Sequence, residues 1–132
     1  MISVRRKVAR GFIYNPETKL FLIVKGALPP FNFHLPGGGI DKGESAEHAL
    51  VRELHEELAI TQENIISVTF LHKAKESVML IPHQLDIFLV TVKDFELQLS
   101  WELSKYKWIS GNELKDYFKS EIIGKVIEKT YT

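Results

Sequence analysis

Hydrophobic residues fall into short runs that alternate with polar ones, a pattern typical of strands. Runs rich in branched and aromatic residues predict strands at 8–15, 20–27, 65–76, 78–95 and 106–110. The first two are predicted to form a hairpin through the proline-containing turn Asn15–Lys19. Pro82 lacks an amide donor, so we expect the fourth strand to lie at an edge or to contain a bulge.

The remaining segments separate into helices and one long loop. Residues 28–39 hold three prolines and three glycines and are predicted to form a loop without regular structure. Residues 45–58 contain neither proline nor glycine and predict a helix. Segments 111–118 and 120–131 predict a closing pair of helices, interrupted at Gly124. Strands around one clear helix predict a layered α/β fold with a mixed sheet, and no linker or repeat divides residues 1–132, so a single domain is expected.

Composition narrows the range of partners. Seventeen basic residues balance seventeen acidic ones, so no global field draws the chain toward nucleic acid or membrane. The absence of cysteine excludes disulfides and thiolate metal sites. Residues 1–12 lack the apolar stretch of a secretory signal, and no apolar run is long enough to span a bilayer. We therefore expect a cytoplasmic protein without a membrane partner; oligomeric state is left open.

Three glutamates crowd the end of the predicted helix. At 100° per residue, Glu53, Glu56 and Glu57 share about a third of the helix circumference, beside the apolar face and not opposite it. Arg52 is the single cation close to them on the helix. Partly desolvated carboxylates that outnumber their cations favour a divalent ion, and all-oxygen ligands suit Mg²⁺ or Mn²⁺.

A glycine-rich loop precedes these acids. Gly37, Gly38 and Gly39 allow backbone amides to approach an anion closely, and the following helix N-terminus favours phosphate oxygens. A diphosphate bridged by the metal to the carboxylates would use both features. Because no serine, threonine or histidine nucleophile stands in the cluster, attack by metal-activated water is favoured over group transfer.

The spacing of these residues resembles the Nudix box, the signature of the MutT-like Nudix hydrolases. The matching positions are Gly38, Glu44, Arg52, Glu53, Leu54, Glu56, Glu57 and Ile60. The resemblance implies an α/β/α sandwich with a central mixed β-sheet. It also implies Mg²⁺-dependent cleavage of a diphosphate that is linked to another moiety, usually a nucleoside.

Roles follow from the same resemblance. Glu56 and Glu57 would be the principal metal ligands, and Glu53 a further ligand or the general base. Arg52 would orient a glutamate, Glu44 would hold the loop through backbone hydrogen bonds, and Gly38 would permit the turn.

One position departs from the pattern, since Ala59 stands where the box has glycine at the helix end. If that position requires a left-handed conformation, alanine costs roughly 1 kcal/mol. The metal ligands are unaffected by this difference.

Further candidates lie outside the box. Glu102, six residues before Trp108, resembles a loop glutamate of some Nudix subgroups that reaches the metal site, and a surface glutamate is the alternative. Phe33, like Phe31 and Phe70, could stack a nucleobase, or could simply pack in the core. Arg10 and Lys25 lie near strand ends and could contact phosphates, with ordinary surface charge as the alternative.

These features predict a pyrophosphohydrolase that acts on a small nucleoside diphosphate derivative, such as a nucleoside triphosphate or a dinucleoside polyphosphate. A Nudix-like module that binds a nucleotide without cleaving it is a second hypothesis, although such a module is expected to lose box carboxylates. Hydrolysis at RNA 5′ ends is a third. The balanced charge counts against it, so no stable nucleic-acid partner is expected.

Overall fold

The computed structural model describes residues 6–78 and 80–130. The strands are β1 (Arg6–Asn15), β2 (Leu20–Gly26), β3 (Phe33–His34), β4 (Gly37–Gly39), β5 (Ile65–Val78), β6 (Ile81–Val92) and β7 (Leu103–Ser110). The helices are α1 (Ala46–Leu58) and α2 (Ser120–Thr130), with 3₁₀ segments η1 (Gln62–Asn64) and η2 (Gly111–Asp116). Residues 1–5, Met79 at the start of the predicted fourth strand, and Tyr131 at the end of the predicted last helix lie outside the described residues.

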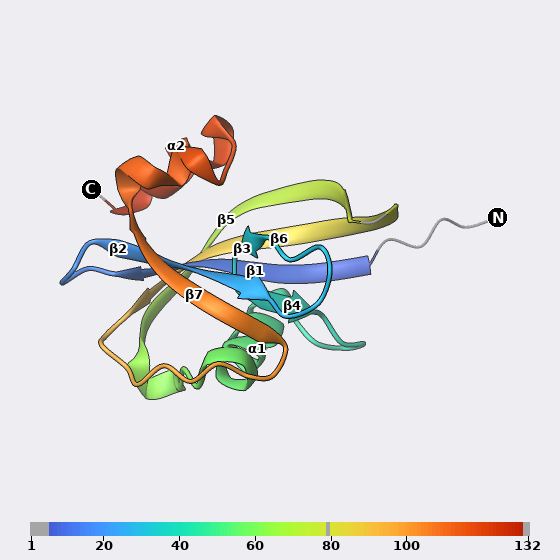
Figure 1. Ribbon diagram of the computed structural model, residues 1–132, viewed down its shortest axis with the longest axis horizontal. Helices are drawn as coiled ribbons and strands as arrows, with labels where there is room; N and C mark the ends of the chain where they lie inside the picture. The colour runs from blue at the N-terminus through green and yellow to red at the C-terminus, as the bar shows by residue number, and fades with distance from the viewer. Residues whose placement is uncertain (1–5, 79, 131–132) are drawn as a thin grey trace.

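The strands form one mixed sheet, with α1 on one face and α2 on the other (Figure 1). The strand order is β3–β2–β1–β6–β5, while β4 pairs with β1 and β7 pairs with β2. The β1–β6 pair is parallel and the other pairs are antiparallel. The predicted α/β/α sandwich with a central mixed sheet is confirmed. Within the described residues, neither helix combines the length and hydropathy needed to cross a bilayer.

The sheet divides the core in two because side chains alternate along each strand. In β2, Phe21 and Ile23 pack toward α2, whereas Leu22 and Val24 pack toward α1. Helix α1 buries Ala49, Leu50, Leu54 and Leu58 against its face of the sheet. This one-sided apolar stripe fixes the rotation of α1 and therefore the direction of its carboxylates.

Three local predictions were wrong. Segment 28–39 contains β3 and β4, because the glycine run pairs with β1 although glycine is a poor strand former. Pro82 lies in β6, an inner strand, and the register shifts between β5 and β6 fall elsewhere. Within the described residues, the pairs of β1 with β6 run from Arg6–His83, one residue beyond Pro82. Gly124 does not interrupt α2.

Both ends of α1 are capped. The Ser45 hydroxyl accepts a hydrogen bond from the His48 amide at 3.1 Å, which satisfies one of the free amides of the first turn. At the other end Ala59 adopts a left-handed conformation with φ of 63°. Its amide donates to the His55 carbonyl at 3.0 Å. Position 59 therefore does require the left-handed conformation in which alanine is less favourable than glycine.

Candidate active site

The three box glutamates differ in their surroundings. Glu57 is buried, with 5% of its surface exposed, and 17% of the Glu53 side chain is exposed. Glu56 is more open, with 55% of its side chain exposed. The prediction that the acids lie beside the packed face of the helix is confirmed for Glu57 and Glu53, whereas Glu56 points toward solvent.

A cavity of about 270 Å³ brings carboxylates from two separated segments together with basic and glycine residues. Its chemically relevant lining residues are Arg6, Arg10, Gly37, Gly38, Gly39, Glu53, Glu57 and Glu102. Glu102 was a candidate without any spacing constraint, and the structure places it beside Glu53 and Glu57. Glu56 does not line this cavity. We call this space the acidic cavity.

Strand β4 forms a wall of the acidic cavity through close backbone approach. The Gly37 amide donates to Glu57 Oε1 at 2.9 Å. A Cβ at Gly37 would overlap the Ala9 carbonyl, and one at Gly38 would lie 2.5–2.7 Å from the carboxylate of Glu53. Glycine is therefore required at Gly37, where the clash is with backbone, whereas at Gly38 the flexible carboxylate of Glu53 would have to move aside. In this structure the anion that the Gly37 amide meets is the carboxylate of Glu57.

Arg52 ties the loop before α1 to the helix. Its Nε and Nη2 donate to the two carboxylate oxygens of Glu44 at 2.8 and 2.9 Å, and Nη2 also donates to the Gly39 carbonyl at 3.1 Å. Nη1 contacts Glu53 at 3.1 Å and Glu56 at 3.3 Å.

Glu44 is the fixed partner of this network. Its Oε1 accepts from the Asp41 amide at 2.9 Å, as expected of a residue that holds the loop. The hydrogen bonds from Arg52 lower the pKa of Glu44 to about 2, and the Asp41 amide acts in the same direction.

Burial sets the electrostatics inside the cavity. Desolvation raises the pKa of Glu57 to about 7, against the opposing effects of the Gly37 amide and the Arg10 charge. Burial also raises the pKa of Glu53, and the neighbouring Glu56 and Glu102 charges act in the same direction. Burial therefore disfavours the ionised form of both carboxylates, and a cation bound beside them would favour that form.

The carboxylate oxygens of Glu53, Glu56 and Glu57 are of the kind that binds a divalent metal, but in this structure each carboxylate contacts another group of the protein. Among the described residues, no three acidic or histidine side chains are already gathered in a ligating arrangement. Glu53 and Glu56 face Arg52, and Glu57 faces the Gly37 amide. These partners contact carboxylate ends, which rotate about side-chain torsions without moving the helix. A hard cation held by Glu53, Glu56 and Glu57 would require these carboxylates to leave their present partners.

Arg10 joins the acidic cavity to a second one. Its Nη1 donates to the carbonyls of Leu35 at 3.2 Å and Gly37 at 2.9 Å, and burial lowers its pKa. The second cavity measures about 330 Å³ and is lined by Arg10, Pro30, Asn32, Phe33, His34, Leu35, Glu76, Leu85, Ile87, Tyr117 and Phe118. We call it the aromatic cavity. Arg10 is thus a shared wall and not an ordinary surface charge.

Two of the remaining candidates lie near the aromatic cavity. Phe33 lines it and meets Tyr117 edge to face, with ring centroids 6.1 Å apart. Lys25 lines neither cavity, and its Nζ lies 6.0 Å from the centre of the Phe33 ring. Arg6 lines the acidic cavity but was not predicted from the sequence. Arg6 and Arg10 are four residues apart in a strand, so their side chains lie on the same face, and this periodicity was the available signal.

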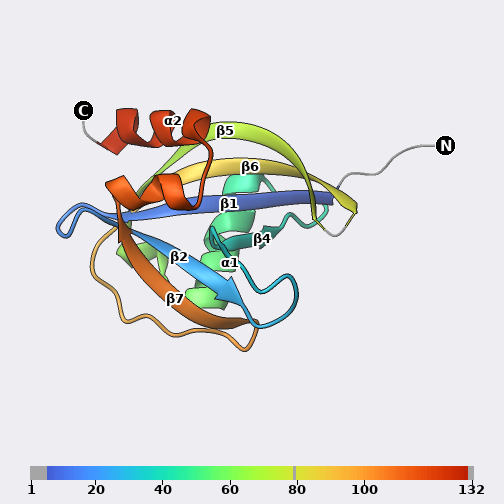
Figure 2. The same ribbon diagram turned by 45° about the horizontal axis from the view of Figure 1, so that its top comes forward.

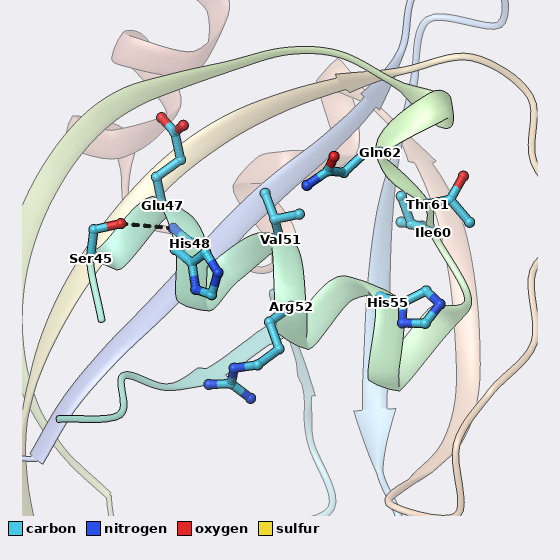
Figure 3. Close-up of a pocket in the computed structure, with 9 residues that line it drawn as sticks. All are labelled: Ser45, Glu47, His48, Val51, Arg52, His55, Ile60, Thr61 and Gln62. Atoms are coloured by element: carbon cyan, nitrogen blue, oxygen red, sulfur yellow. Dashed lines mark hydrogen bonds between the residues drawn. The ribbon is translucent and has the colours of Figure 1, made fainter. Parts of the chain in front are cut away.

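A cavity of about 550 Å³, the outer cavity, lies on the outer side of α1 and is not the chemical site. Its lining includes His48, Arg52 and His55 but none of the box glutamates (Figure 3). His48 and His55 line this cavity and do not line the acidic cavity.

Comparison with known proteins agrees with this geometry. The sequence model of the NUDIX domain matches residues 4–129, and the chain belongs to the Nudix family. Together with hydrolase relatives, this match makes the protein a Nudix hydrolase that acts on pyrophosphate bonds. Nudix hydrolases generally use divalent metals.

Individual relatives show where the chain falls among Nudix proteins. It is 30% identical over 130 residues to an RNA pyrophosphohydrolase of Nitratiruptor, covering 87% of this chain and 83% of the relative. It is also 30% identical to an asymmetrical bis(5′-nucleosyl)-tetraphosphatase of Caenorhabditis elegans, covering 75% and 71%. The solved binary complex of the C. elegans Ap4A hydrolase superposes with a TM-score of 0.80 at 25% identity, covering 94% and 96%.

Proposed function

We propose that the protein is a Mg²⁺-dependent pyrophosphohydrolase that cleaves the diphosphate linkage of a nucleoside 5′-polyphosphate, a nucleoside triphosphate or dinucleoside polyphosphate being the small substrate. The observation that supports this most directly is the junction at Arg10 between an acidic and an aromatic cavity. The diphosphate would lie in the acidic cavity and the nucleoside in the aromatic one.

Each part of the substrate meets suitable groups in this arrangement. Phe33 offers an aromatic face to a base, while Arg10 has guanidinium donors beyond the Nη1 bonds and can reach phosphate oxygens. When bound, a divalent cation supplies charge neutralisation and polarises the phosphoryl group. Glu53, Glu56 and Glu57 would hold it. Glu102, which is not part of the Arg52 network, would accept a proton from the attacking water.

A second candidate is the same chemistry at the 5′ end of RNA. The observation in its favour is the 30% identity to an RNA pyrophosphohydrolase over most of both chains. The absence of excess positive charge across the whole chain argued against this substrate, but it does not test local charge.

The test is hydrolysis of a panel of nucleoside triphosphates and dinucleoside polyphosphates with Mg²⁺, with Mn²⁺ and with chelator. Product analysis in ¹⁸O-labelled water identifies the phosphorus attacked. We expect Glu57→Gln and Glu56→Gln to lower kcat/KM at least about 100-fold, the loss typical when one preorganised charge-stabilising group is removed.

A matched control lies on the same helix. Glu47→Gln changes an exposed glutamate that lines the outer cavity, and we expect its turnover to equal that of the wild type. Turnover undiminished by chelator, or equal in all the glutamate variants, contradicts the metal mechanism. Tight nucleotide binding without hydrolysis across the panel would instead indicate a sensor module.

A further inference from the structure

Three lysines share one face of the sheet beside the aromatic cavity. Lys25 on β2 stands directly opposite Lys105 on β7, and Lys107 lies two residues further along β7. Because side chains alternate along a strand, all three project to the same face, which is the face that α2 covers elsewhere. Phe33 is the neighbour of Lys25 on the other side. We call Lys25, Lys105 and Lys107 the lysine row.

By itself, the lysine row destabilises the folded protein. Like charges directly opposite in an antiparallel pair repel at a separation of about 5 Å. Lys105 and Lys107 are exposed, and no described acidic side chain forms an ion pair with any member of the row. Such a cluster is relieved when an external polyanion binds it.

Contacts place the row at the rim of the aromatic cavity. Lys25 Nζ lies 6.0 Å from the centre of the Phe33 ring, and Lys107 Nζ lies 5.8 Å from that of Tyr117. Lys107 also donates to the Tyr117 hydroxyl at 3.2 Å. Phe33 and Tyr117 both line the aromatic cavity, so a chain leaving that cavity past these rings meets the lysines next.

We propose that the lysine row binds the backbone phosphates of RNA that follow the 5′ nucleoside held in the aromatic cavity. This inference rests on the proposed function, which puts the 5′ phosphates in the acidic cavity and the first nucleoside in the aromatic one. Successive phosphates would then run from the acids, past Phe33, onto the lysines. A mononucleotide ends before it reaches the row.

Binding of RNA phosphates at the lysine row depends on the charge nearby and not on the total charge of the chain, because electrostatic interactions are screened beyond about 8 Å at physiological salt. The balanced total of the whole chain therefore says little about one face. The acids whose charge acts on Lys107 are Glu113 and Asp116 of η2. Glu113 keeps its negative charge, but hydrogen bonds from the Ser110 amide at 3.0 Å and the Ser110 hydroxyl at 3.2 Å hold its Oε1 at the start of η2, and it forms no ion pair with Lys107 within the described residues.

The experiment compares kcat/KM for a short 5′-triphosphorylated RNA with that for the matching nucleoside triphosphate, across a range of salt concentrations. For the RNA we expect log(kcat/KM) to fall with log[salt] with a slope steeper by about 2 than for the mononucleotide, about 0.7 for each of three phosphates. The double variant Lys105→Gln/Lys107→Gln should reduce this extra slope by about 1.4 and lower the ratio of RNA to mononucleotide kcat/KM.

Lys93→Gln is the matched control, because Lys93 is an exposed lysine just beyond the end of β6 and away from the row. It should leave both the slope and the ratio unchanged. A double variant with the wild-type ratio and slope overturns the inference. So does an equal loss on a dinucleoside tetraphosphate, since that result assigns the lysines to a distal nucleotide.

Failure of this inference is distinguishable from failure of the proposed function. If the mononucleotide is hydrolysed with Mg²⁺ and RNA shows no added salt dependence, only the role of the lysine row is wrong. If neither substrate is hydrolysed, the proposed function fails and the lysine proposal falls with it.

Discussion

Replacing Ala59 with glycine should stabilise the protein. Ala59 has φ of 63°, and a left-handed conformation costs a residue with a Cβ roughly 1–2 kcal/mol. Glycine removes that cost but gains freedom in the unfolded chain, which offsets about 0.4–1 kcal/mol. The net expectation for Ala59→Gly is a gain of up to about 1.6 kcal/mol in the free energy of unfolding, centred near about 0.8 kcal/mol, which is equivalent to a rise of about 2–4 °C in Tm for a chain of this size.

Urea unfolding at equilibrium, followed by circular dichroism, measures this difference. The matched control is Ala46→Gly at the first position of α1, where the helix is right-handed and glycine should instead destabilise by about 0.5–1 kcal/mol. The two variants should therefore shift the midpoint in opposite directions. A loss of stability at position 59 equal to that at position 46 would refute the assignment of strain to Ala59.

Three other substitutions test separate features. Gly38→Ala should lower kcat with a small change in stability, because the new methyl presses on the flexible carboxylate of Glu53; steady-state kinetics beside a thermal melt check this. Glu44→Gln should destabilise the protein above pH 4.5, and the deficit should shrink as the pH falls toward 2, since the pKa of Glu44 is lowered by Arg52; urea melts across that range measure it. Leu54→Ala should cost about 2–5 kcal/mol in chemical denaturation, because Leu54 is fully buried under α1.

Local patterns predicted the parts of the fold that depend on few residues. The apolar stripe of α1 placed Glu53 and Glu57 against the sheet, because a helix that buries one stripe has only one rotation available. The same reasoning did not separate Glu56, whose side chain is 55% exposed and does not line the acidic cavity. It also could not foresee β4, since glycine has low strand propensity and pairs here because Gly37 fits against the Ala9 carbonyl.

The surroundings of the basic residues could not be predicted from local sequence patterns, because they depend on which strands pair. Arg10 and Lys25 looked equivalent in sequence, each an isolated cation near a strand end. Pairing of β1 with β4 brings Arg10 to the carbonyl of Gly37, whereas pairing of β2 with β7 sets Lys25 opposite Lys105. The two cations therefore have different neighbours, a distinction that arises only when β1 pairs with β4 and β2 pairs with β7 (Figure 2).

The position of Glu102 shows how the same backbone that ends the helix also completes the site. The Glu57 carbonyl at the end of α1 accepts a hydrogen bond from the Ser100 amide at 2.9 Å. Two residues later the Glu102 carbonyl accepts from the Ala27 amide at 2.8 Å, which fixes the segment to the end of β2. These two bonds hold Glu102 at the acidic cavity by its main chain and leave its carboxylate free. Because the anchors are backbone groups, no side-chain spacing in the sequence could reveal them. The role proposed for Glu102 as base would require no distortion of the helix that carries the other acids.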